Sequence, residues 1–248
     1  MKLVTALGLA WKAAFSKGME REFARYMLAE RICKALYPKY LFSDFGRIWL
    51  EDRAFLDYFE RFVGTDNYHS ADRKYLLRSL LQLVKHLPGD TAECGAYEGA
   101  SSYLICEFFA GAGKEHHVFD SFEGLSAPES VDGSWWHAND LTAGEEILKR
   151  NLAKFPGVHT YRGWIPARFA DVAERRFCVV HIDVDLYSPT RDSLEFFYPR
   201  MVPGGLIVCD DYGYTSCPGA QKALDEFMAG KPEGIVHAPT GQGIVVKR

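Results

Sequence analysis

Patterns that would place the chain in a special class are largely missing from it. Its six cysteines form no CxxC pair, so they are expected to stay reduced and to pack as small hydrophobic side chains, as in a cytoplasmic protein. No apolar stretch has the length required to cross a bilayer. Internal repeats, low-complexity tracts and obvious linkers are missing as well. These absences favour an ordinary globular protein.

An excess of charge of one sign is missing too. The net charge is −4 and the isoelectric point is about 6.1, so no electrostatic argument points to nucleic acid as a partner. With 248 residues, 48% of them hydrophobic and 25% charged, the chain is long enough for one large core and an appended helical piece. The balance suits a protein that acts on a small molecule.

The first 65 residues show helical spacing and no strand-like run, so they are predicted to form a helical N-terminal region. The start, from Met1 to Phe15, has some features of a signal peptide, but Lys12 interrupts the apolar run and no convincing cleavage site follows. An amphipathic helix is favoured there. Such a helix could pack on the main domain, cross to a second subunit or touch a membrane surface.

Beyond this region the pattern alternates between helices and strands. A helix over residues 76–87 stops at Pro88, and the first strand is predicted over residues 91–95. Further helices are expected to begin near Ala100, near Gly144, at Pro189 and at Pro218. Other strands are predicted over residues 117–120, 158–162, 178–183 and 206–209, with a closing antiparallel hairpin over 235–238 and 243–247.

Carboxylates end two of these strands. Asp183 and Asp185 follow one apolar, β-branched run, and Asp210 and Asp211 follow the next, with room between them for one crossover helix over residues 189–200. Parallel strands joined in this way commonly lie side by side, so their carboxyl ends open into the same crevice. Four carboxylates at that edge repel one another unless a cation joins them. Oxygen ligands without a His/Cys cluster favour a hard ion such as Mg²⁺ over zinc.

A glycine-containing turn follows the first strand. Gly95 and Gly99 let the backbone turn sharply and approach a ligand, and the helix that begins near Ala100 offers amide donors. Such a GxxxG turn is weak evidence by itself, because many strand-to-helix turns need glycine for geometry only. The spacing matches neither GxxxxGK[ST] nor GxGxxG, which argues against a phosphate-cradling NTPase and an NAD enzyme.

An acid also ends the second predicted strand. Asp120 lies where doubly wound folds often hold a ribose diol, although it could equally cap a turn or helix. Together with Glu93 at the end of the first strand, it favours a ligand that carries ribose hydroxyls and an amino-acid tail but no pyrophosphate. S-adenosylmethionine has those groups.

Five motifs occur in an order that resembles a known family. They span residues 93–102, 120–125, 163–166, 183–194 and 204–213. They are similar to the successive motifs of the macrocin O-methyltransferase (TylF) family, which includes metal-dependent enzymes that methylate sugar hydroxyls in macrolide and aminocoumarin biosynthesis. The resemblance runs from about residue 70 to the C-terminus. Residues 1–65 carry none of the motifs.

The resemblance implies a fold and a division of the chain. It implies a Rossmann-like class I methyltransferase α/β sheet, mostly parallel with a C-terminal antiparallel hairpin, plus a helical N-terminal region. Residues 1–70 would be that region, and residues 71–248 the S-adenosylmethionine-dependent methyltransferase domain. The implied reaction is metal-dependent O-methylation of a vicinal diol on a sugar of a natural product or glycan. A homodimer in which residues 1–70 cover the active site is one hypothesis.

The resemblance also implies roles for individual residues. Asp183, Asp210 and Asp211 match the magnesium-binding acids, and Asp185 matches the position of the general base, although it could instead orient a metal ligand. The residues that fall where the family contacts S-adenosylmethionine are Glu93, Gly95, Ala96, Tyr97, Ser101, Asp120, Ser121, Trp164 and Asp183.

Several of these residues have a structural alternative. Residues 126–144 form a long polar loop with aromatic side chains, as many lids do, and His137 within it could be a base, a substrate contact or an ordinary surface residue. Trp164 could stack on adenine or belong to the core. His181 is most simply a core histidine. Tyr212 and Tyr214 could line the acceptor pocket or pack beneath it.

Two other functions fit parts of the pattern. An Asp-x-Asp strand also occurs in haloacid-dehalogenase-type phosphatases, but there it opens the domain, whereas here it comes late in the chain. A non-catalytic subunit of the same fold would have no reason to keep four self-repelling acids. Val184 stands where the family often has glycine, and it could narrow the acceptor pocket or face the core. The acceptor itself could be a sugar or a catechol, since both offer vicinal oxygens.

Overall fold

The computed structural model describes residues 2–36, 44–63 and 70–248, and its contacts divide the chain into two compact units, Met1–Asn67 and Tyr68–Arg248. The first unit is helical. Its elements are α1 (Lys2–Phe15), α2 (Gly18–Leu36), the 3-10 helix η1 (Asp44–Glu51) and α3 (Arg53–Phe62). The helical character predicted for this region is confirmed for its described residues.

In the first unit, α3 begins at a defined cap. The side chain of Asp52 accepts a hydrogen bond from the amide of Phe55 at 2.9 Å, which satisfies one of the free donors of the first turn. The helix then buries Phe55, Tyr58 and Phe62 at spacings of three and four residues.

Across the described residues of the whole chain, no helix is both long enough and apolar enough to traverse a lipid bilayer.

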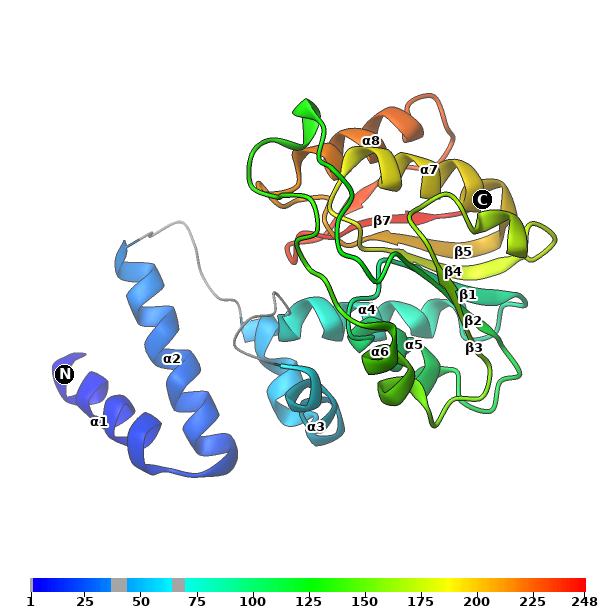
Figure 1. Cartoon of the computed structure of the whole chain (residues 1–248). Coiled ribbons are helices and arrows are strands. Elements are labelled where there is room, and N and C mark those ends of the chain that lie inside the picture. Colours follow the sequence, from blue (N-terminus) through cyan, green and yellow to red (C-terminus); the bar gives the residue numbers. More distant parts are fainter. Residues whose placement is uncertain (1, 37–43, 64–69) are drawn as a thin grey trace. The chain divides into compact units, whose positions relative to one another are not determined.

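The second unit is built around a seven-stranded sheet with the order β3-β2-β1-β4-β5-β7-β6 (Figure 1). The first five strands pair in parallel, and β7 runs antiparallel to both β5 and β6. This is the predicted α/β class with its closing hairpin. The strands are β1 (Asp90–Cys94), β2 (His116–Asp120), β3 (Val158–Arg162), β4 (Phe177–Ile182), β5 (Met201–Cys209), β6 (Val236–His237) and β7 (Gly243–Val246).

Helices cover both faces of this sheet. In Figure 1, α7 (Tyr187–Phe197) and α8 (Pro218–Met228) lie on one face, and α4 (Ala71–Val84), α5 (Ala100–Phe108) and α6 (Glu145–Leu152) lie on the other. Short 3-10 turns occur at Ser130–Asp132, Phe169–Val172 and Tyr198–Arg200.

Two helix boundaries differ from the prediction. Helix α7 begins at Tyr187 rather than Pro189, because a proline is tolerated anywhere in a first turn, where its missing N–H has no partner to lose. Helix α4 begins at Ala71, five residues before the predicted start at residue 76. Its first turns carry the charged residues Arg73 and Lys74 on the buried side, and these interrupt the apolar periodicity on which the prediction rested.

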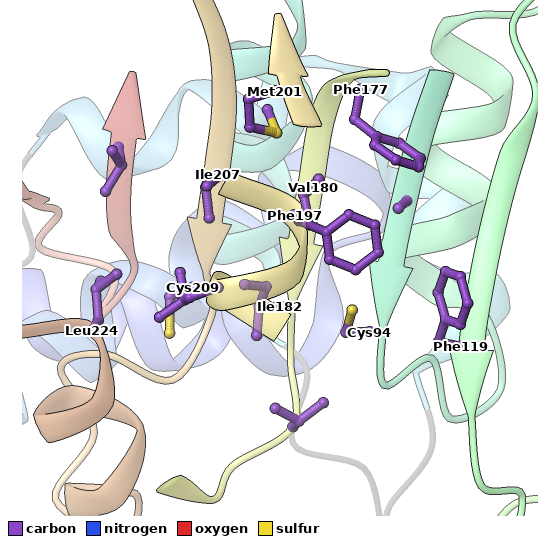
Figure 2. Packing of buried hydrophobic residues seen from close by; sticks show 14 of the residues in the cluster. Cys94, Phe119, Phe177, Val180, Ile182, Phe197, Met201, Ile207, Cys209 and Leu224 are labelled. Carbon is purple, nitrogen blue, oxygen red and sulfur yellow. The ribbon is translucent and has the colours of Figure 1, made fainter. Parts of the chain in front are cut away.

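The larger core packs between the sheet and α7 (Figure 2). Phe197 of α7 is fully buried against aromatic rings, with centroid separations of 5.0 Å to Phe177, 5.0 Å to Phe169 and 5.8 Å to Phe119. Val184 belongs to this cluster, so the residue that replaces the family's glycine faces the core. Alternate residues of β1 and β4, such as Cys94 and Ile182, point into the same cluster.

Because side chains alternate along a strand, Glu93 and His181 point to the opposite face, beneath α4 and α5. His116 of β2 is buried on that face as well. Its ring lies 2.8 Å from the hydroxyl of Thr91 and 3.0 Å from the hydroxyl of Ser102. Burial lowers the pKa of His116 from 6.5 to about 4, although the charge of Glu93 opposes this shift.

We predict that His116 makes the fold sensitive to acid. Its pKa is lower in the folded chain than in the unfolded chain, so its contribution to stability is complete above pH 6.5 and is lost as the pH falls toward 4. The loss amounts to at most about 3 kcal/mol. In urea unfolding at pH 7 and pH 5, His116→Gln should lose less stability between the two pH values than the parent chain does. Equal losses in the two chains would contradict the assignment.

Candidate active site

The carboxyl ends of β1 and β4 are packed directly against each other. Gly95 follows β1 with φ +77°, and a Cβ atom at this position would lie 1.9 Å from the carbonyl oxygen of Asp183. The amide of Asp183 donates a hydrogen bond to the carbonyl of Cys94 at 2.9 Å. Glycine is therefore required both by the positive φ and by the close approach of the acid strand. The glycine turn and the first acid of the Asp-x-Asp motif form one continuous structure.

The carboxylate of Asp120 holds this turn in shape. One oxygen accepts hydrogen bonds from the amides of Ala96, at 2.7 Å, and Tyr97, at 3.1 Å. The other accepts one from the amide of Phe122 at 2.7 Å. Burial raises the pKa of Asp120, and these amide donors act against that shift. Two roles were predicted for Asp120, turn cap and ribose ligand. In the structure its carboxylate caps the turn.

The carboxyl ends of β4 and β5, where Asp183, Asp185, Asp210 and Asp211 lie, are called the acid edge. A row of buried charges crosses the sheet beneath it. Glu93 of β1 lies 2.9 Å from Nδ1 of His181 on β4, and Nε2 of His181 lies 3.2 Å from Asp210, which follows β5. The other oxygen of Asp210 accepts a charge-assisted hydrogen bond from Arg73 of α4. Gln242, just before β7, donates to Asp210 at 2.6 Å. The row alternates in sign from Glu93 to Arg73.

The pKa shifts agree with this alternation. Although burial disfavours the charged form of His181, the carboxylates of Asp210 and Glu93 raise its pKa to about 10, so the ring is protonated at neutral pH. Burial also acts to raise the pKa of Asp210. The positive charges of Arg73, Lys74 and His181 outweigh it and hold the pKa of Asp210 well below the ordinary value. His181 is therefore more than a core histidine, because it links two buried acids.

The guanidinium of Arg73 also approaches the remaining acids. Its Nη2 atom lies 3.9 Å from Asp183 and 3.7 Å from Asp211, in addition to its bond with Asp210. Lys74 lies 3.9 Å from both Asp183 and Asp210, and it donates to the hydroxyl of Ser101 at 2.5 Å. Both cations are buried. Arg73 and Lys74 thus supply positive charge that offsets the repulsion among the four buried carboxylates.

The donor set suits a divalent cation. Carboxylates of Asp183, Asp210 and Asp211 face the same nitrogen of Arg73, with Asp183 and Asp211 at 3.9 and 3.7 Å. Ligand atoms within 4.8 Å of one another form two groups here, His181 with Asp183 and Asp210, and Asp185 with Asp211 and Cys217. Carboxylate oxygens alone are the ligands of a hard ion such as Mg²⁺. The side chain of Asp183 is about one quarter exposed, so this corner of the cluster is open to solvent. The three carboxylates would fit such an ion if the guanidinium moved aside and Asp183 and Asp211 turned toward Asp210.

Asp185 has an unusual backbone conformation at this edge. Its φ is +59°, a left-handed value that non-glycine residues seldom adopt. Its amide donates to Asp211 at 3.0 Å, and its carboxylate accepts a hydrogen bond from the thiol of Cys217 at 3.4 Å. Burial, reinforced by the negative charge of Asp183, raises the pKa of Asp185 to about 7. The carboxylate is therefore a stronger base than an exposed aspartate.

Residues 126–144 contact the part of the site that contains Asp185. The indole nitrogen of Trp136 donates to the sulfur of Cys217 at 3.3 Å, and Cys217 in turn contacts Asp185. The side chain of Asp132 accepts a hydrogen bond from the amide of Tyr187, the first residue of α7, at 2.7 Å. Trp135, by contrast, is 61% exposed. The loop is thus attached to the acid edge while part of it faces solvent.

Not all of the predicted site residues meet at this edge. Asp183, Asp185, Asp210 and Asp211 do, and Gly95, Ala96, Tyr97 and Asp120 form the adjoining turn. The carboxylate of Glu93 is buried beneath the edge, bonded to His181 and Ser102. The hydroxyl of Ser121 is used within its own turn, donating to the carbonyl of Gly124.

Two of the predicted aromatic site residues, Trp164 and His137, are exposed. Trp164 is 46% exposed, so it is not a core residue, and its indole donates to the carbonyl of Gly124 at 3.3 Å. His137 lies on the surface beside Asp140, 3.5 Å away. Tyr214 packs under the guanidinium of Arg73, with a ring centroid 4.7 Å away. All of the predicted cofactor, metal and catalytic roles stay predictions, including cofactor contact for Glu93, Ser101, Ser121 and Trp164 and catalysis by His137.

Sequence reasoning missed several residues that complete the site, namely Arg73, Lys74, Cys217 and Gln242. A signal for Arg73 was present. It lies four and eight residues before Leu77 and Leu81, which places a cation on the buried face of an amphipathic helix. A charge in that position needs a buried partner. Nothing in the sequence around Gln242 indicated its contact.

Residues 72–237 match the family model described as Macrocin-O-methyltransferase (TylF). The 8-demethyl-8-(2,3-dimethoxy-alpha-L-rhamnosyl)-tetracenomycin-C 4'-O-methyltransferase of Streptomyces olivaceus is 31% identical over 152 residues, which cover 56% of this chain and 58% of that protein. The demethyldecarbamoylnovobiocin O-methyltransferase of Streptomyces niveus is 29% identical over 167 residues, covering 58% and 60%. The chain thus spans less than two thirds of the length of these relatives.

Solved structures resemble the chain as well. The O-methyltransferase NovP is 25% identical, with a TM-score of 0.58 over 73% of this chain and 83% of that one. The calicheamicin methyltransferase CalS11 is 17% identical, with a TM-score of 0.62 over 73% and 80%, and it shares the fold. None of these matches supports the phosphatase or the non-catalytic alternative.

We predict that the fold depends on the cation of Arg73. Replacing it by leucine leaves Asp210 buried with one cation fewer, a change that typically costs about 3–5 kcal/mol. The measurement is urea unfolding in a buffer with a chelator, so that no divalent ion replaces the lost charge. The matched control is Arg150→Leu on the exposed surface of α6, which should shift stability by less than about 0.5 kcal/mol. Similar values for both variants would refute the prediction.

Proposed function

We propose that this chain, which belongs to the macrocin O-methyltransferase family, moves the methyl group of S-adenosylmethionine to a hydroxyl of a vicinal diol. The acceptor is a sugar of a natural product or glycan. One observation carries the proposal: the carboxylates of Asp183, Asp210 and Asp211 surround the same nitrogen of Arg73 beside Asp185, at the edge where the Gly95 turn lies.

The cofactor is proposed to lie over the glycine turn. Asp120 ends β2 next to this turn, where a carboxylate is placed to accept a ribose hydroxyl. Gly95 leaves room for close approach, and the N-terminus of α5 provides amide donors. Lys74 and Ser101 lie at the same end of α5 and offer donors for a carboxylate, which the amino-acid tail of S-adenosylmethionine carries.

Asp183, Asp210 and Asp211 are the residues that would hold Mg²⁺. When bound, that ion would lower the pKa of a coordinated sugar hydroxyl and orient it. Methyl transfer is an in-line displacement, so the acceptor oxygen must be held against the methyl carbon. The acid edge and the segment that contains Trp136 would hold the acceptor oxygen in this position.

Asp185 is proposed to take the proton of the attacking hydroxyl. It lies beside the acids that would orient the acceptor, and its pKa of about 7 matches the operating pH of a general base. Its amide bond to Asp211 and its left-handed φ fix the direction of the carboxylate. Cys217 contributes a weak donor that positions one carboxylate oxygen.

The setting of the enzyme is part of the proposal. The curated relatives are named for the methylation of rhamnosyl, novobiocin and mycinamicin compounds, which supports a sugar-bearing natural product as the acceptor. We place the protein in the cytoplasm, with residues 126–144 as a lid and residues 1–70 as the contact of a homodimer. A monomeric mass in solution scattering would remove the homodimer from the proposal.

The cofactor is tested by calorimetric titration of S-adenosylmethionine with Mg²⁺ present. The parent chain should bind saturably. Asp120→Ala should bind at least about tenfold more weakly, because it removes the proposed acceptor of the ribose hydroxyl and also the carboxylate that holds the turn. Asp171→Ala, at an exposed position of the same domain, should bind like the parent. NAD should not bind. No binding of S-adenosylmethionine by the folded parent chain would sink the proposed function.

The general base is tested by Asp185→Asn. Asparagine tolerates the left-handed φ and keeps the size of the side chain, so the change removes the base and leaves the backbone in place. Turnover with radiolabelled S-adenosylmethionine and deoxysugar glycosides should fall by about 10²–10⁴, as for loss of a general base. Affinity for S-adenosylmethionine should stay within about threefold, a difference of less than one kcal/mol. Undiminished turnover would assign Asp185 an orienting role instead.

A further inference from the structure

A second cluster of metal-ligating side chains lies at the opposite edge of the sheet. Asp90 begins β1, Glu115 precedes β2, and His117 and His159 are the second residues of β2 and β3. The strands that carry the proposed active site at their carboxyl ends thus carry this cluster at their amino ends. The proposed methyl transfer uses none of these four residues.

Three of the ligand atoms lie close enough together to hold one metal ion, and His159 lies beside them. Nε2 of His117 lies 3.5 Å from Asp90 Oδ2 and 3.9 Å from Glu115 Oε2. Nε2 of His159 lies 3.6 Å from the same oxygen of Glu115. Ligands at about 2.0–2.1 Å from a tetrahedral zinc ion are roughly 3.4 Å apart. The ligand atoms of Asp90, Glu115 and His117 all lie within 4.8 Å of one another, so small movements would bring these three to that geometry. A larger movement of the exposed His159 ring would add the fourth ligand.

The sheet itself places the two histidines together. His117 and His159 are partners in the parallel register of β2 and β3. Their rings stack with centroids 5.4 Å apart and planes at 19°. On the other side of the His117 ring, Nδ1 lies 3.0 Å from the hydroxyl of Tyr161. A partner on Nδ1 fixes the ring and directs Nε2 into the cluster, as in metal sites whose histidines are held from behind.

Two atoms of the cluster are buried without a hydrogen bond. They are Nε2 of His117, whose side chain is 1% exposed, and Oε2 of Glu115, and neither has a hydrogen-bond partner among the described residues. Leaving such a group unsatisfied typically costs about 1–3 kcal/mol. The guanidinium of Arg175 lies 2.9 Å from Oε2 of Glu115 and offsets its charge. Nε2 of His117, 3.9 Å from the same oxygen, is therefore the atom that indicates a missing ligand.

The guanidinium of Arg175 forms ion pairs with two carboxylates of the cluster. Arg175 places Nη1 at 2.9 Å from Glu115 Oε2 and 3.2 Å from Asp90 Oδ2. Its side chain is about half exposed, so it can leave the two carboxylates without unpacking the core. Arg175 would therefore compete with a metal ion for the same pair of oxygens.

We propose that Asp90, Glu115, His117 and His159 bind a zinc-type divalent cation. Two imidazoles with two carboxylates suit Zn²⁺ and its neighbours in the first transition row rather than Mg²⁺, which prefers oxygen ligands alone. The ion joins the amino ends of β1, β2 and β3 and has a structural role. This site is independent of the proposed methyl transfer, because it lies at the other edge of the sheet.

The test is a titration of the full-length protein with Co²⁺ in excess Mg²⁺, followed by visible absorption. Tetrahedral Co²⁺ absorbs strongly and octahedral Co²⁺ weakly, so Co²⁺ held by oxygen ligands at the acid edge would not give the signal. The parent chain should take up one tetrahedral Co²⁺, and Zn²⁺ should displace it. His159→Ala and Glu115→Gln, both at partly exposed positions, should weaken binding by more than about tenfold.

Two further variants complete the test. His86→Ala, an exposed histidine outside the cluster, should bind Co²⁺ like the parent chain. Arg175→Ala should bind it several times more tightly, because the competing guanidinium is gone. A parent chain without the tetrahedral spectrum would overturn the proposal, even if Arg175→Ala acquired the spectrum, since Arg175 would then be the resident cation. An unchanged spectrum in His159→Ala and Glu115→Gln would overturn it as well.

Discussion

The alternating row of buried charges from Glu93 through His181 and Asp210 to Arg73 is the constraint on which the second unit depends. It crosses β1, β4 and β5 and reaches α4, so it ties the middle of the sheet to the helix that covers it. An isolated buried charge would be far too costly to keep, and each member of the row is stabilised by its neighbours. The row therefore favours the neighbouring positions of β1, β4 and β5.

The catalytic geometry proposed for the acid edge is set by this row. His181 and Gln242 contact one oxygen of Asp210, and a cation, either Arg73 or the proposed Mg²⁺, faces the other. The carboxylate therefore stays ionised and in place, and Asp211, the next residue, keeps its position beside Asp185. Burial and the negative charge of Asp185 raise the pKa of Asp211 well above the usual value. The ionised side chains of Glu93, His181 and Asp210 beneath the acid edge thus hold Asp185 and Asp211 in place above it. Such preorganised, strained and poorly solvated groups are common at functional sites.

Much of the fold could be predicted from the sequence, because each strand carries its own pattern. The β-branched runs before Asp183 and Asp210, with one helix between them, were enough to place both acids at one edge. The contact of Arg73 with that edge could not be predicted in the same way, since it depends on how α4 crosses the sheet. The left-handed φ of Asp185 was also invisible, because no glycine or asparagine marked it.

Asp120 has a kinetic consequence. A carboxylate offers about four acceptor positions, and the amides of Ala96, Tyr97 and Phe122 use three of them. The turn is consequently ordered before any ligand arrives, and it can accept one more donor without giving up a bond. Association with this turn should need no loop-folding step and should approach the rate of simple encounter. A slow phase in ligand binding would have to come from another segment, such as residues 126–144, whose Trp135 faces solvent.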